Sequence, residues 1–292
     1  MENSDIKDLV FRQAVDAIDR GDILSLSQIL ETNPSLVNLR LDKPTEGYFA
    51  HPYLLWFIAD NPIRNKKLAP NIVEITQIII KALKKNPHDS YQYQVDYTMG
   101  LVATGRIPRE CAVQLPLMEL LINEGAKVKR GVLGPIGQNN FEAARYLLSK
   151  GATYNLATAV ALDNSESING FLKNASASEL YVALVVASFF GKVDMISQLI
   201  NAGADPNGNA TREDFGGFHS HASTLHQAVS SGSIDAVKLL VHAGANLHAK
   251  DKIYDGTPLE WAEHMKSAEN DENKKKKYRE IEDYLLSIMN EK

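Results

Sequence analysis

Cysteine is almost absent from the sequence, with Cys111 alone among 292 residues. One cysteine excludes an internal disulfide framework. No apolar run approaches the roughly 18 residues that a helix needs to span a bilayer, so we expect no transmembrane segment. The first residues, MENSDIKDLV, are polar and acidic, so we expect no secretory signal and a cytoplasmic location.

An excess of positive charge is also missing. Lysine and arginine number 31 against 36 aspartates and glutamates, which gives a formal net charge of −5. Binding to nucleic acid without sequence preference needs clustered positive charge, so we expect no nucleic-acid partner. The run Lys274 to Lys277 lies beside Glu272, Glu280 and Glu282, and we interpret it as a partly neutralised, solvated helix face.

The sequence contains four similar stretches, which read LINEGAKV, LLSKGATYN, LINAGADPN and LVHAGANLH. In each, an apolar pair precedes a Gly-Ala pair. The Gly-Ala pairs are Gly125-Ala126, Gly151-Ala152, Gly203-Ala204 and Gly244-Ala245. Such self-similarity indicates a repeated supersecondary unit. A stack of these units is an extended surface, so a binding module is favoured over an enzyme.

The clearest copy predicts two short helices, over residues 225–230 and 234–243. Ser223 is placed to cap the first helix, and Gly232 and Gly244 follow the two helices where a left-handed residue is needed. Helices this short are marginal in water on their own, so each pair needs a neighbouring pair to cover its apolar face. The apolar stripe predicts that Leu147, Leu199 and Leu240 are almost fully buried.

Two segments carry a family resemblance. Residues 223–228 read STLHQA and residues 257–262 read TPLEWA, and both resemble the Thr-Pro-Leu-His-x-Ala signature of ankyrin repeats. In the first copy Ser and Thr replace Thr and Pro, and in the second Glu replaces His. The arrangement, including FHSHASTLH, is similar to bacterial ankyrin-repeat proteins that are mostly uncharacterised. This resemblance implies an all-α solenoid of stacked helix-turn-helix pairs, and about eight units fit the sequence, some of them degenerate. Because such a stack is an extended surface, we expect a protein that binds other proteins and is not an enzyme.

We expect residues 1–292 to form a single, monomeric ankyrin-repeat domain. Its parts are an N-terminal cap repeat at 5–40, degenerate and shortened repeats at 48–177, well-formed repeats at 178–265 and a C-terminal cap helix at 266–292.

A long insertion at residues 208–222 is the strongest indication of a functional site. Connections in compact folds usually run about two to six residues, and longer ones are often functional. The insertion carries Phe215, Phe218, His219 and His221. These side chains could form an interaction surface, or the two phenylalanines could fold back and seal the gap between neighbouring repeats.

The partner-binding prediction combines this insertion with the concave helix face. Its residues are Phe215, Phe218, His219, His221, Gln227, Tyr254 and Glu260. The partner is a protein whose identity the sequence does not give. One alternative is an inhibitory or immunity role toward an enzyme or toxin encoded by a neighbouring gene.

A metal-dependent enzyme is the less favoured alternative. Six of the eight histidines lie between His219 and His264, and the pair His219 and His221 has a spacing that could hold a metal. No cysteine is near, and the resemblance gives His226 a structural role in fixing the turn. Cys111 has no identifiable base, and the glycine run at 131–137 lacks the Lys-Ser/Thr of a phosphate loop. We therefore predict no catalytic residue, no metal and no cofactor. We interpret the glycine run at 131–137 as a turn and short helix.

Overall fold

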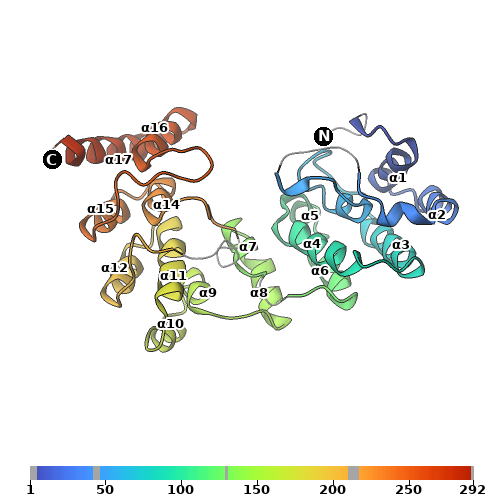
Figure 1. The fold of residues 1–292 in the computed structure, drawn as a ribbon, viewed down its shortest axis with the longest axis horizontal. Coiled ribbons are helices and arrows are strands. Elements are labelled where there is room, and N and C mark those ends of the chain that lie inside the picture. The colour runs from blue at the N-terminus through green and yellow to red at the C-terminus, as the bar shows by residue number, and fades with distance from the viewer. Residues whose placement is uncertain (1–4, 42–46, 129–130, 210–216, 291–292) are drawn as a thin grey trace. The chain divides into compact units, whose positions relative to one another are not determined.

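The regular elements of the protein are helices (Figure 1). The computed structural model describes residues 5–41, 47–128, 131–209 and 217–290. Within these ranges there is no β-strand, and the one extended pairing is an isolated antiparallel bridge between Arg40 and Tyr53. The all-α prediction is confirmed.

The chain divides into two compact units, which we describe separately. Unit 1 comprises Met1–Gly131 and Glu142–Ala152, and unit 2 comprises Val132–Phe141 and Thr153–Lys292. A stack of repeats has contacts mainly between neighbours, and one domain can therefore contain several compact parts. The single domain over residues 1–292 stays a prediction.

Unit 1 contains three consecutive helix pairs. Its elements are α1 (Leu9–Arg20), α2 (Ile23–Thr32), η2 (Pro34–Asn38), η3 (Gly47–Phe49), η4 (Leu54–Ala59), α3 (Ile72–Lys85), α4 (Tyr91–Thr104), α5 (Arg106–Glu110), α6 (Gln114–Asn123) and α8 (Phe141–Ser149). The first members of the pairs contact one another in the order α1, η4, α4, and the second members in the order α2, α3, α6. This double row is the arrangement that the repeats predict.

Unit 2 repeats the same arrangement with better-formed pairs. Its elements are α7 (Leu133–Gly137), α9 (Leu156–Ala161), α10 (Ser165–Leu172), α11 (Ala177–Phe189), α12 (Val193–Asn201), α14 (Thr224–Ser231), α15 (Ile234–His242), α16 (Pro258–Ala268) and α17 (Glu272–Asn290). The first helices contact one another in the order α9, α11, α14, α16, and α12, α15 and α17 form the second row. Each pair therefore covers the apolar face of the next.

The Gly-Ala signature ends the second helix of each copy as predicted. Gly125, Gly151, Gly203 and Gly244 all have φ between 88° and 97°, a left-handed conformation that costs glycine little. The apolar stripe is buried as expected, since Leu147 is 1% exposed and Leu199 and Leu240 are fully buried. These repeated contacts give unit 2 a rigid frame for the loops between its helix pairs.

Candidate protein-interaction site

The loop that joins α15 to α16 is organised by one buried carboxylate, that of Asp251. Its oxygens accept hydrogen bonds from the backbone N–H groups of Ile253 at 2.9 Å, Tyr254 at 2.8 Å and Gly256 at 3.1 Å, and from the indole Nε1 of Trp261 at 3.0 Å. Burial raises the pKa of the Asp251 carboxyl, but the bonds from the loop and from Trp261 outweigh it and hold the pKa well below the usual range. The carboxylate stays ionised and fixes the loop.

Further contacts close the same loop, residues 250–256, which we call the tip loop. The backbone N–H of Asp251 donates to the carbonyl of Gly256 at 2.9 Å, and Lys250 forms an ion pair with Asp255. The N–H of Lys252 donates to the carbonyl of His221 at 2.9 Å, which ties the tip loop to the preceding insertion. A loop held at this many points is preorganised, so it loses little further freedom on binding.

Two neighbouring apolar side chains project from the tip loop into solvent. Ile253 is 63% exposed and Tyr254 is 77% exposed. The other large hydrophobic side chains exposed in the described ranges are Leu9, Leu24, Leu39, Tyr48, Ile63, Tyr93 and Leu286, and none of these is next to another in the sequence. Single exposed apolar residues are normal, whereas a contiguous apolar surface marks an interaction site.

Of the predicted site residues in the insertion, Phe218 is buried and only 6% exposed. Its ring packs at 5.0 Å from the ring of Phe189 and 6.1 Å from that of Phe190, at the end of α11. This placement is the one that the sealing alternative describes, and it corrects the expectation that Phe218 forms part of the exposed surface. Phe215 lies outside the described residues.

Gln227 needs the same correction, because it is fully buried within α14. Its side-chain amide donates to the carbonyl of His219 at 2.8 Å. The amide therefore satisfies a backbone group of the insertion and cannot meet a partner directly. The sequence pattern places Gln227 on a helix face but does not reveal that residues 217–222 cover that face.

Three histidines surround the Trp261 indole. The ring centroids of His219, His221 and His226 lie 5.3, 5.9 and 5.0 Å from that of Trp261. Burial lowers the pKa of His219, and His221 nearby lowers it further. Burial also lowers the pKa of His226, against the opposing influence of its bond to Gly256 and of Asp251.

His221 connects this cluster to the exposed surface. Its ring lies 6.0 Å from the Tyr254 ring, and its Nε2 lies 3.9 Å from a carboxylate oxygen of Asp251 without a hydrogen-bond partner. In the ranges that the structure describes, no three His, Cys, Asp or Glu side chains come together as a potential metal-ligand set. The three histidine rings contact Trp261, whose indole donates to Asp251 of the tip loop.

Glu260 is exposed, but its carboxylate is engaged at the start of α16. It accepts from the N–H of Thr257 at 2.7 Å and from the Thr257 hydroxyl at 2.8 Å, in a capping box. These bonds lower the pKa of Glu260, the backbone bond most. Tyr254 is thus the predicted residue most available to a partner, and Ile253 is an exposed neighbour that sequence reasoning missed. Asp251 lies two positions before Ile253, and aspartate is a residue type that organises turns. This local signal could have identified the loop that exposes Ile253.

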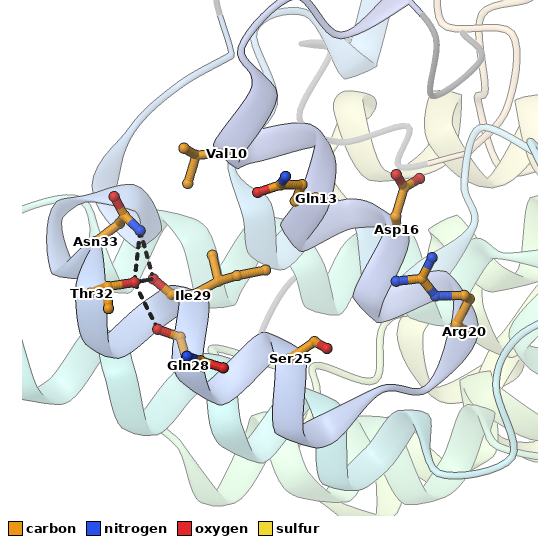
Figure 2. Close-up of a pocket in the computed structure, with 9 residues that line it drawn as sticks. All are labelled: Val10, Gln13, Asp16, Arg20, Ser25, Gln28, Ile29, Thr32 and Asn33. Atoms are coloured by element: carbon orange, nitrogen blue, oxygen red, sulfur yellow. Dashed lines mark hydrogen bonds between the residues drawn. The ribbon is translucent and has the colours of Figure 1, made fainter.

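Unit 1 carries a groove of about 470 Å³ (Figure 2). It lies between α1 and α2 and is lined by Val10, Gln13, Asp16, Arg20, Ser25, Gln28, Ile29, Thr32 and Asn33. The Thr32 hydroxyl and the Asn33 amide bond to carbonyls of their own helix, at 2.8 Å to Gln28 and 3.1 Å to Ile29. A largely polar face of this kind suits the outer side of a terminal capping repeat.

The other sequence features have structural roles. Lys274, Lys275 and Lys276 are paired with Glu269, Glu272 and Glu280 at 3.6, 3.3 and 4.0 Å, which agrees with a partly neutralised face. The glycine run supplies α7, as the interpretation of a turn and short helix predicts. Across the described ranges, no helix combines the length and the apolar character that crossing a bilayer requires.

Comparison with known proteins agrees with this architecture. Residues 156–251 match the family model described as ankyrin repeats (3 copies). The match spans the three pairs α9/α10, α11/α12 and α14/α15 and ends at Asp251 of the tip loop. The crystal structure of the human ASB11 ankyrin repeat domain is similar at 17% identity with a TM-score of 0.34, covering 80% of this chain and 96% of that chain. The family match and the stacked pairs, and not this similarity, identify the repeats.

Residues 156–251 are therefore ankyrin repeats, with three matched copies. Ankyrin repeats are general protein–protein interaction modules, in which the stacked helix pairs provide the surface. The class of function that the sequence favours, a binding module, is consistent with this family.

Proposed function

We propose that this protein binds a partner protein through the tip loop, with Ile253 and Tyr254 as the side chains that insert into the partner. The single observation that carries the proposal is the exposure of these two adjacent side chains on a loop fixed by Asp251. Tyrosine is enriched among the residues that contribute most to binding, because its large ring has few rotatable bonds.

The partner should be a folded protein with an apolar depression, since the tip loop offers projecting side chains and not a groove. His221 extends the surface beside Tyr254, and the exposed Lys252 adds a positive charge at its edge. His219 and Phe218 support this surface from beneath through Trp261 and the end of α11. Residues 219–221 of the insertion, which are half-buried, and the face of the first helices complete the proposed contact area.

As part of this proposal, the protein acts as a cytoplasmic monomer and binds no nucleic acid. A role as the inhibitor of an enzyme or toxin is one form of the same activity, in which the partner is the inhibited protein. Nothing among the described side chains favours the metal-dependent enzyme as a second candidate.

The test compares two double variants of the full chain. Ile253→Ala with Tyr254→Ala removes the proposed anchors, and Leu9→Ala with Leu24→Ala removes two other exposed side chains from unit 1, which are 60% and 82% exposed. Proteins that co-purify with the wild type from the native cell are identified, and the affinity of each is then measured with purified components.

Truncation of the tip should weaken the partner's affinity by about 30-fold or more, which corresponds to roughly 2 kcal/mol. The Leu9 and Leu24 variant should bind like the wild type. Both variants should keep the melting temperature of the wild type, since exposed side chains contribute little to stability. Equal affinities for the wild type and the tip variant would refute the proposed site.

A further inference from the structure

A second loop, in unit 1, is organised around a buried aspartate as the tip loop is. It covers residues 60–67, between η4 and α3, and we call it the unit 1 loop. The Asp60 carboxylate at its start is buried. Its oxygens accept hydrogen bonds from the backbone N–H groups of Arg64 at 3.0 Å, Asn65 at 3.1 Å and Lys66 at 2.9 Å. These bonds close the loop on itself, as aspartate does in many turns.

The unit 1 loop is also attached to the helices around it. The guanidinium of Arg64 forms a bidentate pair with the Asp19 carboxylate of α1, at 2.8 and 3.2 Å. The same guanidinium lies 4.9 Å from the centre of the Phe57 ring in η4. The side-chain amide of Asn61 donates to the carbonyl of Leu101 in α4 at 2.9 Å. A surface on this loop is therefore preorganised, so it loses little freedom when a partner binds.

Two exposed apolar side chains lie at this loop. Ile63, within the loop, is 42% exposed, and Tyr48 is 56% exposed. They are separated in the sequence, but the Tyr48 hydroxyl donates to the side-chain oxygen of Asn61 at 3.1 Å, two residues before Ile63. The Tyr97 hydroxyl of α4 donates to the carbonyl of Tyr48 and holds this residue in place. The fold thus gathers two apolar side chains at one place on the surface of unit 1, which is a feature of interaction sites.

The rim of this surface is positively charged. Lys66 and Lys67 are exposed at the end of the unit 1 loop. Arg40 is also exposed, and its guanidinium donates to two carbonyls that follow Tyr48 closely in the chain, at 2.9 and 3.2 Å. No carboxylate of the described residues forms an ion pair with any of these three cations. The apolar centre is therefore flanked by positive charge that the chain itself leaves unbalanced.

We propose that Ile63, Tyr48 and these three cations form a second docking site, which binds an acidic segment of a partner protein that also carries an apolar side chain. Complementary charge at the rim steers such a segment to the site and repels basic ones. Its apolar side chain packs against Ile63 and Tyr48, in the arrangement of an apolar centre within a polar rim that protein interfaces have. This inference concerns a different loop from the proposed function, and each can fail without the other.

A protein segment fits this surface better than a single-stranded nucleic acid does. Bases need ring faces on which to stack. The Trp56 ring beside Tyr97 is buried, and the two rings stack on each other at 4.2 Å. The side chain exposed on the loop is the aliphatic Ile63, which offers no ring face.

The test is a selection from a library of random peptides displayed on phage, with the full-length protein as bait. Each selected peptide is measured against two double variants that carry the same change of charge. Lys66→Glu with Lys67→Glu reverses the rim of the proposed site, and Lys81→Glu with Lys85→Glu reverses two exposed lysines of α3 in the same unit.

We expect a class of peptides rich in acidic and apolar residues. These peptides should bind the rim variant about tenfold or more weakly, because each reversal turns an attraction into a repulsion, and the α3 variant within about twofold of the wild type. Their binding should also weaken as the salt concentration rises. Ile63→Ala should weaken the same peptides, whereas Ile253→Ala with Tyr254→Ala in the tip loop should leave their binding unchanged.

The inference is overturned if no acidic class of peptides is selected, or if the rim variant and the α3 variant bind that class equally. An oligothymidylate that binds the wild type and is lost in the rim variant would assign the surface to nucleic acid and overturn it as well. If the rim variant melts at a lower temperature than the wild type, Ile63→Ala with Lys67→Glu decides by the same criteria, because it keeps Lys66 beside Asp60.

Discussion

Gly137 and Gly217 approach so closely that no side chain fits between their backbones. A Cβ atom on Gly137 would lie 2.4 Å from the carbonyl oxygen of Gly217, and one on Gly217 would lie 2.7 Å from the carbonyl oxygen of Gly134. The glycine run at 131–137 thus allows α7 to pack directly against the start of the 217–222 segment. Both segments belong to unit 2.

We predict that Gly137→Ala destabilises the protein by about 1–3 kcal/mol, since the new methyl group must push two backbones apart. The matched control is Gly170→Ala within α10, where a Cβ meets nothing within 4 Å. That change should be neutral or stabilise by up to about 1 kcal/mol, because alanine favours the helix. Denaturant unfolding of both variants checks the pair, and a loss as large in Gly170→Ala would contradict the close approach.

Leu240 tests the repeat register. It is fully buried on α15, so Leu240→Ala should cost about 2–5 kcal/mol. Leu286→Ala, on α17, removes the same atoms from a side chain that is 39% exposed, and it should cost well under that amount. A loss below about 1 kcal/mol at Leu240 would contradict the assigned register.

Phe218 and Tyr254 should contribute very differently to stability. Because it packs against Phe189 and Phe190, Phe218→Ala should destabilise the fold by about 3–5 kcal/mol, typical of a lost core aromatic. Tyr254→Ala should change the free energy of unfolding by less than about 0.5 kcal/mol, because its side chain is 77% exposed. Thermal or denaturant unfolding of the two variants measures the difference. Equal losses of unfolding free energy in the two variants would contradict the assignment of Phe218 to the core and of Tyr254 to the exposed surface.

The acid dependence of Asp251 has a defined sign. Its carboxyl has a lowered pKa in the folded state, so it contributes stability that is present above the ordinary aspartate value of about 3.9 and is lost as the pH falls further. Asp251→Ala leaves four N–H donors without their acceptor, and it should cost about 3 kcal/mol or more at neutral pH. It should also flatten the fall in stability below about pH 4, measured by denaturant unfolding over that range. An unchanged acid profile would show that Asp251 does not organise the tip loop.

The repeat architecture could be predicted from the sequence because its signals are local. Gly203 and Gly244 end helices through their own backbone conformation, and Leu199 and Leu240 are buried by a stripe that is visible within one helix. Ser223 caps α14 and Gly232 follows it, as predicted.

The candidate site was predicted less completely, because it depends on contacts between separate segments. The sequence pattern places Gln227 on the surface. In the structure its side chain donates to the carbonyl of His219, which lies eight positions earlier in the chain. Phe218 fits both interpretations of the insertion until its distance to Phe189 is known. The exposure of Ile253 follows from the bonds of Asp251, one of which comes from Trp261, ten residues further on.

Contact between the tip loop and the partner can be detected by site-specific crosslinking in the native cell. A photo-crosslinking phenylalanine analogue replaces Tyr254, which is 77% exposed, in one variant and Leu24 of unit 1, which is 82% exposed, in another, while the rest of the chain is unchanged. We expect one dominant crosslinked protein from position 254, which is absent from position 24 and is lost when Ile253→Ala is added. The same products from both positions, or a partner that crosslinks at position 24 and not at position 254, would contradict it.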